Sequence, residues 1–302
     1  MSIYDQRDPR FRALIQGSAR LDHLGTGMRW AEGPVWFPAH RALLLSDIPN
    51  DRIMRWTEET GLSVFRQGVN YTNGHTRDRE GRMVSCSHGA RAVLRTEADG
   101  TQIVLADRHG GKRLSSPNDV VVSRDGAIWF TDPTYGILSD YEGYQAPPEQ
   151  DANAVYRIPP GGGGGGGQPL RVATGFVQPN GLAFSPDESR LYVADSGRSH
   201  DPEVRALLRV FEVKGGALGE GHDFAEVDAG IPDGLRVDAA GHVWCSAGDG
   251  VHVFHPDGTL LGKVLVPETV ANLCFGGPRG NRLFIAATTS LYAIFVNARA
   301  PD

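Results

Sequence analysis

Six positions of the sequence carry side-chain oxygen at the start of a recurring unit, and their residue types point to metal-ion chemistry. Six such side chains that converge in a narrow space would repel one another unless a cation or ordered water organised them. Two carboxylates and several amides suit a hard cation, and calcium tolerates irregular oxygen geometry better than magnesium does. The absence of Cys and His from the set argues against zinc. The positions are Glu32, Asn73, Asn118, Asn180, Asp233 and Asn272.

A simpler interpretation exists for any single copy, because Asn and Asp before glycine often initiate turns. The recurrence of side-chain oxygen in every copy favours the metal site over this alternative. Glu32 supports the same conclusion, since glutamate is not a turn-forming residue.

Each of these residues opens a unit that consists of a short apolar strand, a turn and a second apolar strand. Examples are NDVVVSRDGAIWFTD from Asn118 and DGLRVDAAGHVWCSAG from Asp233. The units recur at intervals of roughly 40 to 60 residues, and the shorter intervals match a four-stranded propeller blade. We therefore predict an all-β fold, a six-bladed β-propeller with four-stranded blades. Its innermost strands would bring the six residues to one mouth of the central channel.

The predicted propeller domain spans residues 20–302 and follows a short N-terminal extension, residues 1–19. The sixth unit lacks a fourth strand, and the segment RLDHLG before Glu32 is expected to supply it and close the ring. The one helix candidate, DPRFRALIQ, falls in the extension and is placed outside the propeller. The glycine run 161–167 is interpreted as a flexible hairpin tip without a functional role.

Composition limits the classes of partner. With a net charge of −6 and no long cluster of Lys and Arg, nucleic acid is not expected as a ligand. No apolar stretch reaches the ~20 residues that span a bilayer, and the charged N-terminus lacks the apolar core of a secretory signal. We expect a cytoplasmic monomer or dimer that acts on a small molecule. The three cysteines, Cys86, Cys245 and Cys274, are expected to be buried free thiols.

Four longer strings resemble the SMP-30/gluconolactonase/luciferin-regenerating-enzyme family in its microbial form. They are EGPVW, SPNDVVVSRDGAIWFTDPTYG, QPNGLAFSPDESRLYVADS and PDGLRVDAAGHVW, and the resemblance covers nearly the whole chain. It implies that Glu32, Asn180 and Asp233 are metal ligands. It also implies that Asn118 is a further ligand or a substrate contact.

The resemblance implies a lactonase that opens a sugar lactone with the help of one divalent ion and an activated water. Asp233 is the expected general base as well as a ligand. Calcium is the expected ion, with zinc, manganese and magnesium as alternatives. Ser116 stands where vertebrate members carry an arginine that holds substrate hydroxyls, so their substrate preference is not transferred. Arg113 is the candidate replacement, and a surface arginine without a role is the alternative.

Three further residues are candidate substrate contacts. Asn73 belongs to the ring, and Tyr135 lies with Asp132 in the DPTYG string, which could line the pocket or hold a second ion. His75 could contact substrate, relay a proton or be an ordinary hydrogen-bonded histidine. A related propeller esterase or phosphotriesterase and a non-catalytic binding module remain alternative functions. The ring of oxygens favours an enzyme, because a binding scaffold has no need to concentrate acids in its channel.

Overall fold

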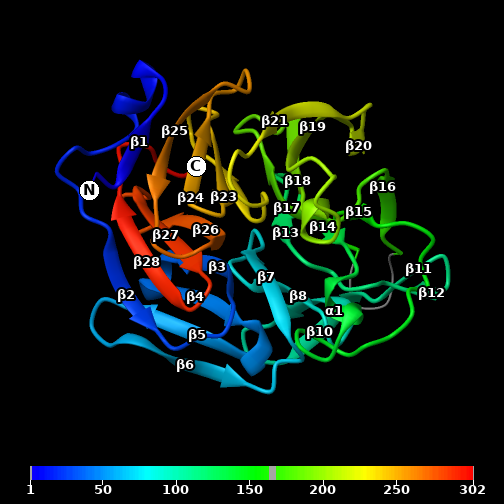
Figure 1. Ribbon diagram of the computed structural model, residues 1–302. Helices are drawn as coiled ribbons and strands as arrows, with labels where there is room; N and C mark the ends of the chain where they lie inside the picture. The colour runs from blue at the N-terminus through cyan, green and yellow to red at the C-terminus, as the bar shows by residue number, and fades with distance from the viewer. Residues whose placement is uncertain (1, 163–167, 302) are drawn as a thin grey trace.

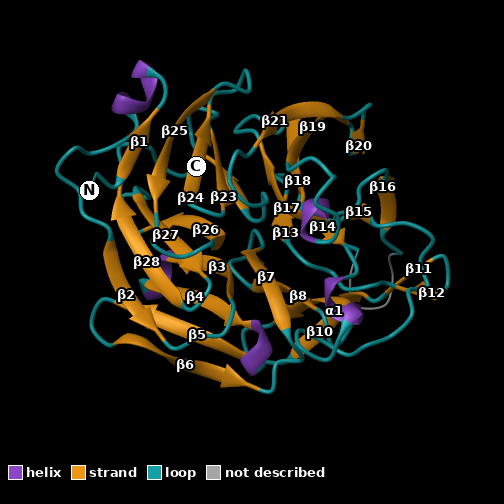
Figure 2. Ribbon diagram, viewed as in Figure 1, coloured by secondary structure: helices purple, strands orange, loops and turns teal. Residues whose placement is uncertain are grey.

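The computed structural model describes residues 2–162 and 168–301, and their regular structure is nearly all β (Figures 1 and 2). Six antiparallel sheets stand around a central axis, and in Figure 1 the chain colour passes once round the ring. The predicted six-bladed propeller with four-stranded blades is confirmed. Within the glycine run, residues 163–167 lie outside the described part, so the interpretation of that segment stays a prediction.

The first three blades follow one another along the chain, each with its strands in sequence order from the axis outward. Blade one contains β3 (Ala31–Phe37), β4 (Ala42–Asp47), β5 (Arg52–Thr57) and β6 (Gly61–Gln67). Blade two contains β7 (Thr72–Arg77), β8 (Met83–Ser87), β9 (Ala92–Thr96) and β10 (Gln102–Ala106). Blade three contains β13 (Val120–Val122), β14 (Ile128–Asp132), β15 (Ala154–Ile158) and β16 (Leu170–Ala173).

The last three blades each include a departure from this simple order. Blade four contains β17 (Pro179–Phe184), β18 (Arg190–Asp195), β19 (Leu207–Lys214) and β21 (His222–Glu226), with β20 (Ala217–Leu218) at the end of β19. Blade five contains β22 (Leu235–Val237), β23 (Val243–Ala247), β24 (Gly250–Phe254), β25 (Leu260–Leu265) and β1 (Tyr4–Gln6). Blade six contains β26 (Val270–Gly276), β27 (Arg282–Ala287), β28 (Ser290–Phe295) and β2 (Asp22–Thr26).

Short elements occupy the connections between strands. They are the hairpin of β11 (Arg108–His109) and β12 (Lys112–Arg113), the helix α1 (Tyr135–Leu138), and 3-10 turns at Pro9–Ala13, Pro38–His40, Ile48–Asn50 and Gly197–Ser199. Among the described residues, no helix has the length and apolar character needed to cross a membrane.

Hydrophobic packing between neighbouring blades holds the ring together. Six clusters of buried apolar residues lie in the described chain, and each joins two adjacent blades. Between blades two and three, for example, Val84 and Cys86 pack with Phe130 and Tyr156. The three cysteines are buried free thiols, as expected.

The ring closes through pairing of the two ends of the chain. β2 is antiparallel to β28, with Asp22 opposite Ala293 and Thr26 opposite Ser290. The predicted use of the RLDHLG segment as the missing outer strand of blade six is therefore confirmed. Since the first and last parts of the propeller share one sheet, interstrand pairing joins the two ends of the chain and completes the fourth strand of blade six.

The N-terminal segment is packed on the propeller. β1 pairs with β25 as a fifth strand of blade five, with Asp5 opposite Lys263. Phe11, in the 3-10 turn that follows, is completely buried in the same cluster as Trp244 and Leu261. From the sequence, the helix candidate in this segment is predicted to lie outside the propeller. The segment is rich in charged residues, and two buried apolar residues, Phe11 and Leu14, pack it against the propeller.

Glycine next to the ring positions lets the innermost strands approach very closely. These strands, β3, β7, β13, β17, β22 and β26, contact one another in that order and close back on β3. A Cβ on Gly181 would lie 2.3 Å from the carbonyl oxygen of Asp233, and one on Gly234 would lie 2.1 Å from the side chain of Asn272. Backbone bonds, such as Gly181 N–H to the Asp233 carbonyl at 3.1 Å, tie the blades together at this level.

We predict that Phe11→Ala lowers the free energy of unfolding by about 3 kcal/mol, because it removes a buried aromatic ring and leaves a cavity. Urea denaturation of the chelator-treated protein measures this. Arg12→Ala is the matched control, since Arg12 is the exposed neighbour and its loss should cost less than about 0.5 kcal/mol. Equal stability of the two variants would mean that the N-terminal segment is not part of the folded unit.

Candidate functional site

The six predicted ring residues come together at one mouth of the channel, where the innermost strands begin. All six are buried, with 8% or less of each residue exposed. Asn272 donates from Nδ2 to Oε2 of Glu32 at 2.9 Å. Asn180 hydrogen-bonds to the carboxyl group of Asp233, and the charges of Asp233 and Glu32 act on each other.

The two carboxyl groups of the ring have no positively charged partner among the described residues. Burial raises the pKa of Glu32 from 4.5 to about 8, and nearby acids add to the effect. Burial also raises the pKa of Asp233 well above its ordinary value, and the charge of Glu32 is the next largest cause. Two acids in this setting share protons in the absence of a cation and are strong ligands in its presence.

The amide side chains divide into those that hold the carboxylates and those with free acceptor atoms. Asn272 is fully used, because its Oδ1 accepts the backbone N–H of Leu273 at 2.8 Å while its Nδ2 serves Glu32. Asn73 pairs through Nδ2 with Nε2 of His88 at 3.2 Å. Its Oδ1 is buried without a hydrogen-bond partner in the described structure. An orphaned acceptor of this kind fits a bound cation or water.

Three aspartates fix the loops that lead into the ring. Asp47, Asp132 and Asp195 each end the second strand of a blade and accept backbone N–H groups two and three residues before a ring residue. In blade three, Ser115 and Ser116 donate to Asp132 at 2.9 and 2.8 Å, just ahead of Asn118. Burial raises the pKa of Asp132 to about 7, although these two bonds oppose the shift.

The same arrangement recurs in two other blades. Asp47 accepts from the N–H of Arg29 at 2.8 Å, ahead of Glu32. Asp195 accepts from Val177 and Gln178 at 3.0 and 2.8 Å, ahead of Asn180. The repeated aspartate at the end of the second strand was visible in the sequence as the endings LSD, FTD and VAD. Its role as a backbone clamp depends on the loop that folds back over it.

Two acidic residues near the ring were not predicted. Asp119 follows Asn118 where the other blades mostly carry glycine, and its buried Oδ2 has only Arg236 nearby, at 3.5 Å. An alignment of the six repeats would have shown this acid at a position where most repeats have glycine. Glu142 comes from the long connection between α1 and β15, and its charge reaches both Glu32 and Asp233. Burial raises its pKa to about 7. It has no counterpart in other units, so no repeat pattern could reveal it.

Tyr135 lies at the rim of the ring. Its hydroxyl bonds to the carbonyl of Ser196 at 3.3 Å and to the hydroxyl of Ser199 at 2.9 Å, which joins the long connections of blades three and four. Burial raises its pKa, and the charge of Asp233 adds to this, so the phenol is close to that carboxyl group. The position fits the predicted substrate contact.

Two other predicted contacts have different surroundings. His75 is completely buried below the ring, where Ser46 and Ser85 occupy its two ring nitrogens at 2.8 and 2.7 Å. Burial lowers its pKa to about 3, so the ring is neutral. Arg113 lies on β12 and donates to the carbonyl of Ala90 at 3.1 Å, and no ring residue is among its described partners. Ser116 is used in the loop, where its hydroxyl donates to Pro133 at 2.8 Å.

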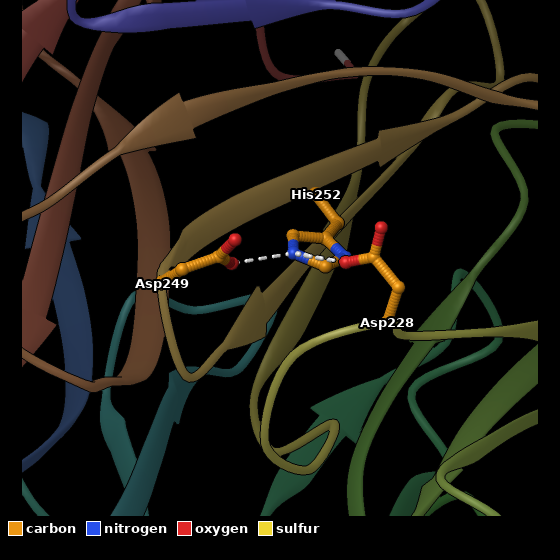
Figure 3. Close-up of side chains that lie close together, drawn as sticks. All are labelled: Asp228, Asp249 and His252. Carbon is orange, nitrogen blue, oxygen red and sulfur yellow. Dashed lines mark hydrogen bonds and ion pairs between the residues drawn. The ribbon is translucent and has the colours of Figure 1, made fainter.

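A second group of acids lies outside the ring, with Asp249 and His252 on blade five and Asp228 in the connection from blade four to blade five. Figure 3 shows Asp228, Asp249 and His252, with Asp249 at 2.7 Å from Nε2 of His252. Lys263 donates to both aspartates through Nζ, at 2.8 Å for Asp249. This buried ammonium group pairs with both carboxylates, whereas the carboxyl groups of the ring have no such partner among the described residues, so the ring is the better candidate cation site.

The raised pKa of Glu32 predicts how pH affects the metal-free protein. The folded state binds the Glu32 proton more tightly than the unfolded chain does, so the contribution of Glu32 to stability is fully present below about pH 4.5 and is lost as pH rises toward 8. Glu32→Gln should make this fall shallower by a few kcal/mol, since the amide stays neutral. Urea denaturation in chelator at several pH values measures both curves. Identical slopes for the two proteins would contradict the assignment.

Comparison with known proteins agrees with the predicted resemblance. The family model described as SMP-30/gluconolactonase/LRE-like region matches residues 30–289. The gluconolactonase of Zymomonas mobilis is 32% identical in an alignment that covers 95% of this chain and 84% of the relative. The pentonolactonase XacC of Haloferax volcanii is 29% identical and is matched over 86% of this chain and 82% of its own length.

A solved structure gives the same result at the level of the fold. A gluconolactonase from Xanthomonas campestris superposes with a TM-score of 0.89 at 40% sequence identity, covering 97% of this chain and 94% of that protein. The family match extends over all six blades. The chain therefore belongs to the SMP-30/gluconolactonase/luciferin-regenerating-enzyme family.

Proposed function

We propose that this protein is a metal-dependent lactonase that hydrolyses a sugar lactone at the ring mouth of the propeller. The observation that carries the proposal is the pair of buried carboxyl groups, Glu32 and Asp233, set among amide oxygens without a compensating positive charge. The gluconolactonase and pentonolactonase relatives support the same reaction class. The acids would be costly to maintain unless a bound cation used them.

The donor set fits a divalent cation. Glu32, Asp233, Asn180 and Asn118 would hold the ion, and the oxygen-only character of these ligands makes calcium our proposed choice over zinc, manganese and magnesium. A divalent cation bound there would polarise the lactone carbonyl and lower the pKa of a bound water. The clamping aspartates would keep three of these four ligands in place before the ion arrives.

Asp233 is our proposed general base. It would take a proton from the attacking water and return it to the ring oxygen when the acyl carbon–oxygen bond breaks, giving the open hydroxy acid. The bond from Asn180 holds the carboxylate in orientation. The backbone N–H of Asp233 donates to Ser246 Oγ at 3.2 Å, which fixes the start of β22.

The long connection between β14 and β15 of blade three would hold the sugar. Tyr135 and Glu142 both lie close enough to Asp233 for their charges to interact with it, and both come from this connection. We propose that the phenol and the carboxylate contact substrate hydroxyls. Asn73 is a further candidate because of its free Oδ1.

The first experiment measures acid release from glucono-1,5-lactone in a pH-stat. Chelator-stripped protein is compared with the same protein after calcium, magnesium, manganese or zinc is added, with spontaneous hydrolysis subtracted. Hydrolysis that calcium restores supports the proposal. An aryl ester and a phosphotriester run in parallel, and preferential hydrolysis of either would favour the related propeller esterase over the lactonase. Absence of activity toward every substrate with every ion would refute an enzymatic role.

We predict that Asp233→Asn lowers kcat about 10² to 10⁴-fold, because the amide keeps one ligating oxygen and the size of the side chain but cannot accept the proton. Calorimetric titration with calcium, done beside the assay, separates loss of base from loss of metal. Asp228→Asn, in the connection between blades four and five, is the matched control and should retain kcat. If Asp233→Asn keeps near-native turnover, another group is the base.

We also predict that Asp132→Asn weakens calcium binding about tenfold, because Ser115 and Ser116 donate to different oxygens of Asp132, an amide has only one oxygen, and the loop carrying Asn118 loosens. The dissociation constant is measured well below the melting temperature. Asp238→Asn is the control, since Asp238 also accepts backbone N–H groups, from Ala240 and His242 at 2.9 and 3.0 Å, but lies in the turn after β22. Similar affinity loss in both variants would indicate a general effect of stability.

A further inference from the structure

The channel has a second mouth, where the innermost strands end. Its cavity has a volume of about 300 Å³. Residues near the C-terminal ends of all six innermost strands line it, including Trp36, Arg77 and Phe275. Arg77 lies four residues after Asn73 of the ring on the same strand, which is about 13 Å at the usual rise of a strand. We call this cavity the distal mouth, and it is a different place from the ring.

Positive charge gathers at the distal mouth although the whole chain has a net charge of −6. Among the described residues, the cavity is lined by four arginines, Arg77, Arg79, Arg124 and Arg236, and by one carboxylate residue, Glu188. The four arginines come from blades two, three and five, so the fold and not local sequence brings them together. A concave site lined by one sign of charge attracts ions of the opposite sign.

Two of these arginines are held in place by other groups. Arg79 donates to the carbonyl of Ser123 at 3.2 Å and lies 3.7 Å from Glu188. Arg124 donates to the carbonyl of Pro186 at 2.6 Å, and its backbone N–H reaches Glu188 at 2.9 Å. Glu188 therefore interacts with both Arg79 and Arg124. It forms no ion pair with Arg77 or Arg236, the other two arginines that line the cavity, in the described structure.

The remaining two arginines, Arg77 and Arg236, line the same cavity, and Arg236 donates to the carbonyl of Leu235 at 2.7 Å. Arg236 lies 3.5 Å from the buried Asp119 below the ring. No hydrogen bond or ion pair joins the guanidinium of Arg77 to any other residue within 2–162 and 168–301. Burial raises the pKa of the Cys274 thiol to about 12, and the charges of Arg236 and Arg77 oppose that shift, so both cations lie close to the same buried side chain.

We propose that the distal mouth is a binding site for a small oxyanion, a phosphate or carboxylate group held by Arg77 and Arg236. Guanidinium groups bind such ions through paired N–H donors, and the cavity brings two of them into one partly desolvated place. Trp36 lines the same cavity, and its Nε1 is buried without a hydrogen-bond partner in the described structure. This site does not depend on the proposed lactonase activity.

Calorimetric titration of chelator-stripped protein with inorganic phosphate tests the proposal, with sodium chloride at matched ionic strength in the reference. Acetate in a second series distinguishes a carboxylate from a phosphate as the preferred ion. We expect saturable binding of at least one of them. Arg77→Gln should weaken it about tenfold, while Arg12→Gln, which removes an exposed guanidinium elsewhere, should leave it within twofold.

The Asp233→Asn protein locates the site. Unchanged oxyanion binding in this variant supports the distal mouth, because the ring has been altered and the arginines have not. Loss of binding in Asp233→Asn would place the ion at the ring and overturn the proposal. Absence of saturable binding by the parent protein, or equal affinity of Arg77→Gln and the parent, would overturn it as well.

Discussion

The close approach of six innermost strands at one mouth of the channel is the constraint on which the rest of the structure depends. Adjacent strands come so near that a side chain on Gly181 or Gly234 would overlap the ring residue of the next blade. Backbone hydrogen bonds at this mouth and apolar clusters farther out join each blade to its neighbours, and the pairing of β2 with β28 closes the ring. A blade that moved outward would break contacts with two neighbours at once, so the ring is rigid.

That rigidity has an electrostatic consequence. Glu32 and Asp233 are held in a buried place where burial raises the pKa of both, and the charge of Glu32 raises the pKa of Asp233 further. Buried acids of this kind are characteristic of functional sites, where groups needed for activity lower the stability of the fold. A cation would convert the repulsion into ligation, so the same geometry that weakens the metal-free protein prepares the proposed metal centre.

The channel is polarised from one end to the other. Acids and amides occupy the ring, and arginines line the distal mouth, with the Asp119 and Arg236 pair between them. Each end is assembled from several blades, so neither charge cluster corresponds to a charge run in the sequence. The two ends are therefore separate chemical environments on one rigid frame, and the connections over the ring can vary without altering the arginine end.

The sequence by itself determined the repeat, the all-β propeller and the six residues of the ring, because each blade must present the same strand position to the axis and so repeats the same residue type there. It also indicated the closing strand. It could not indicate that Glu142 reaches the ring or that Phe11 anchors the N-terminal segment, since each occurs once. Only the tertiary structure decided that Ser46 and Ser85 enclose His75, that Asp132 binds backbone and that Arg77 and Arg236 share a cavity. Those relations join residues of different strands or blades, and their distances are set by how the sheets pack.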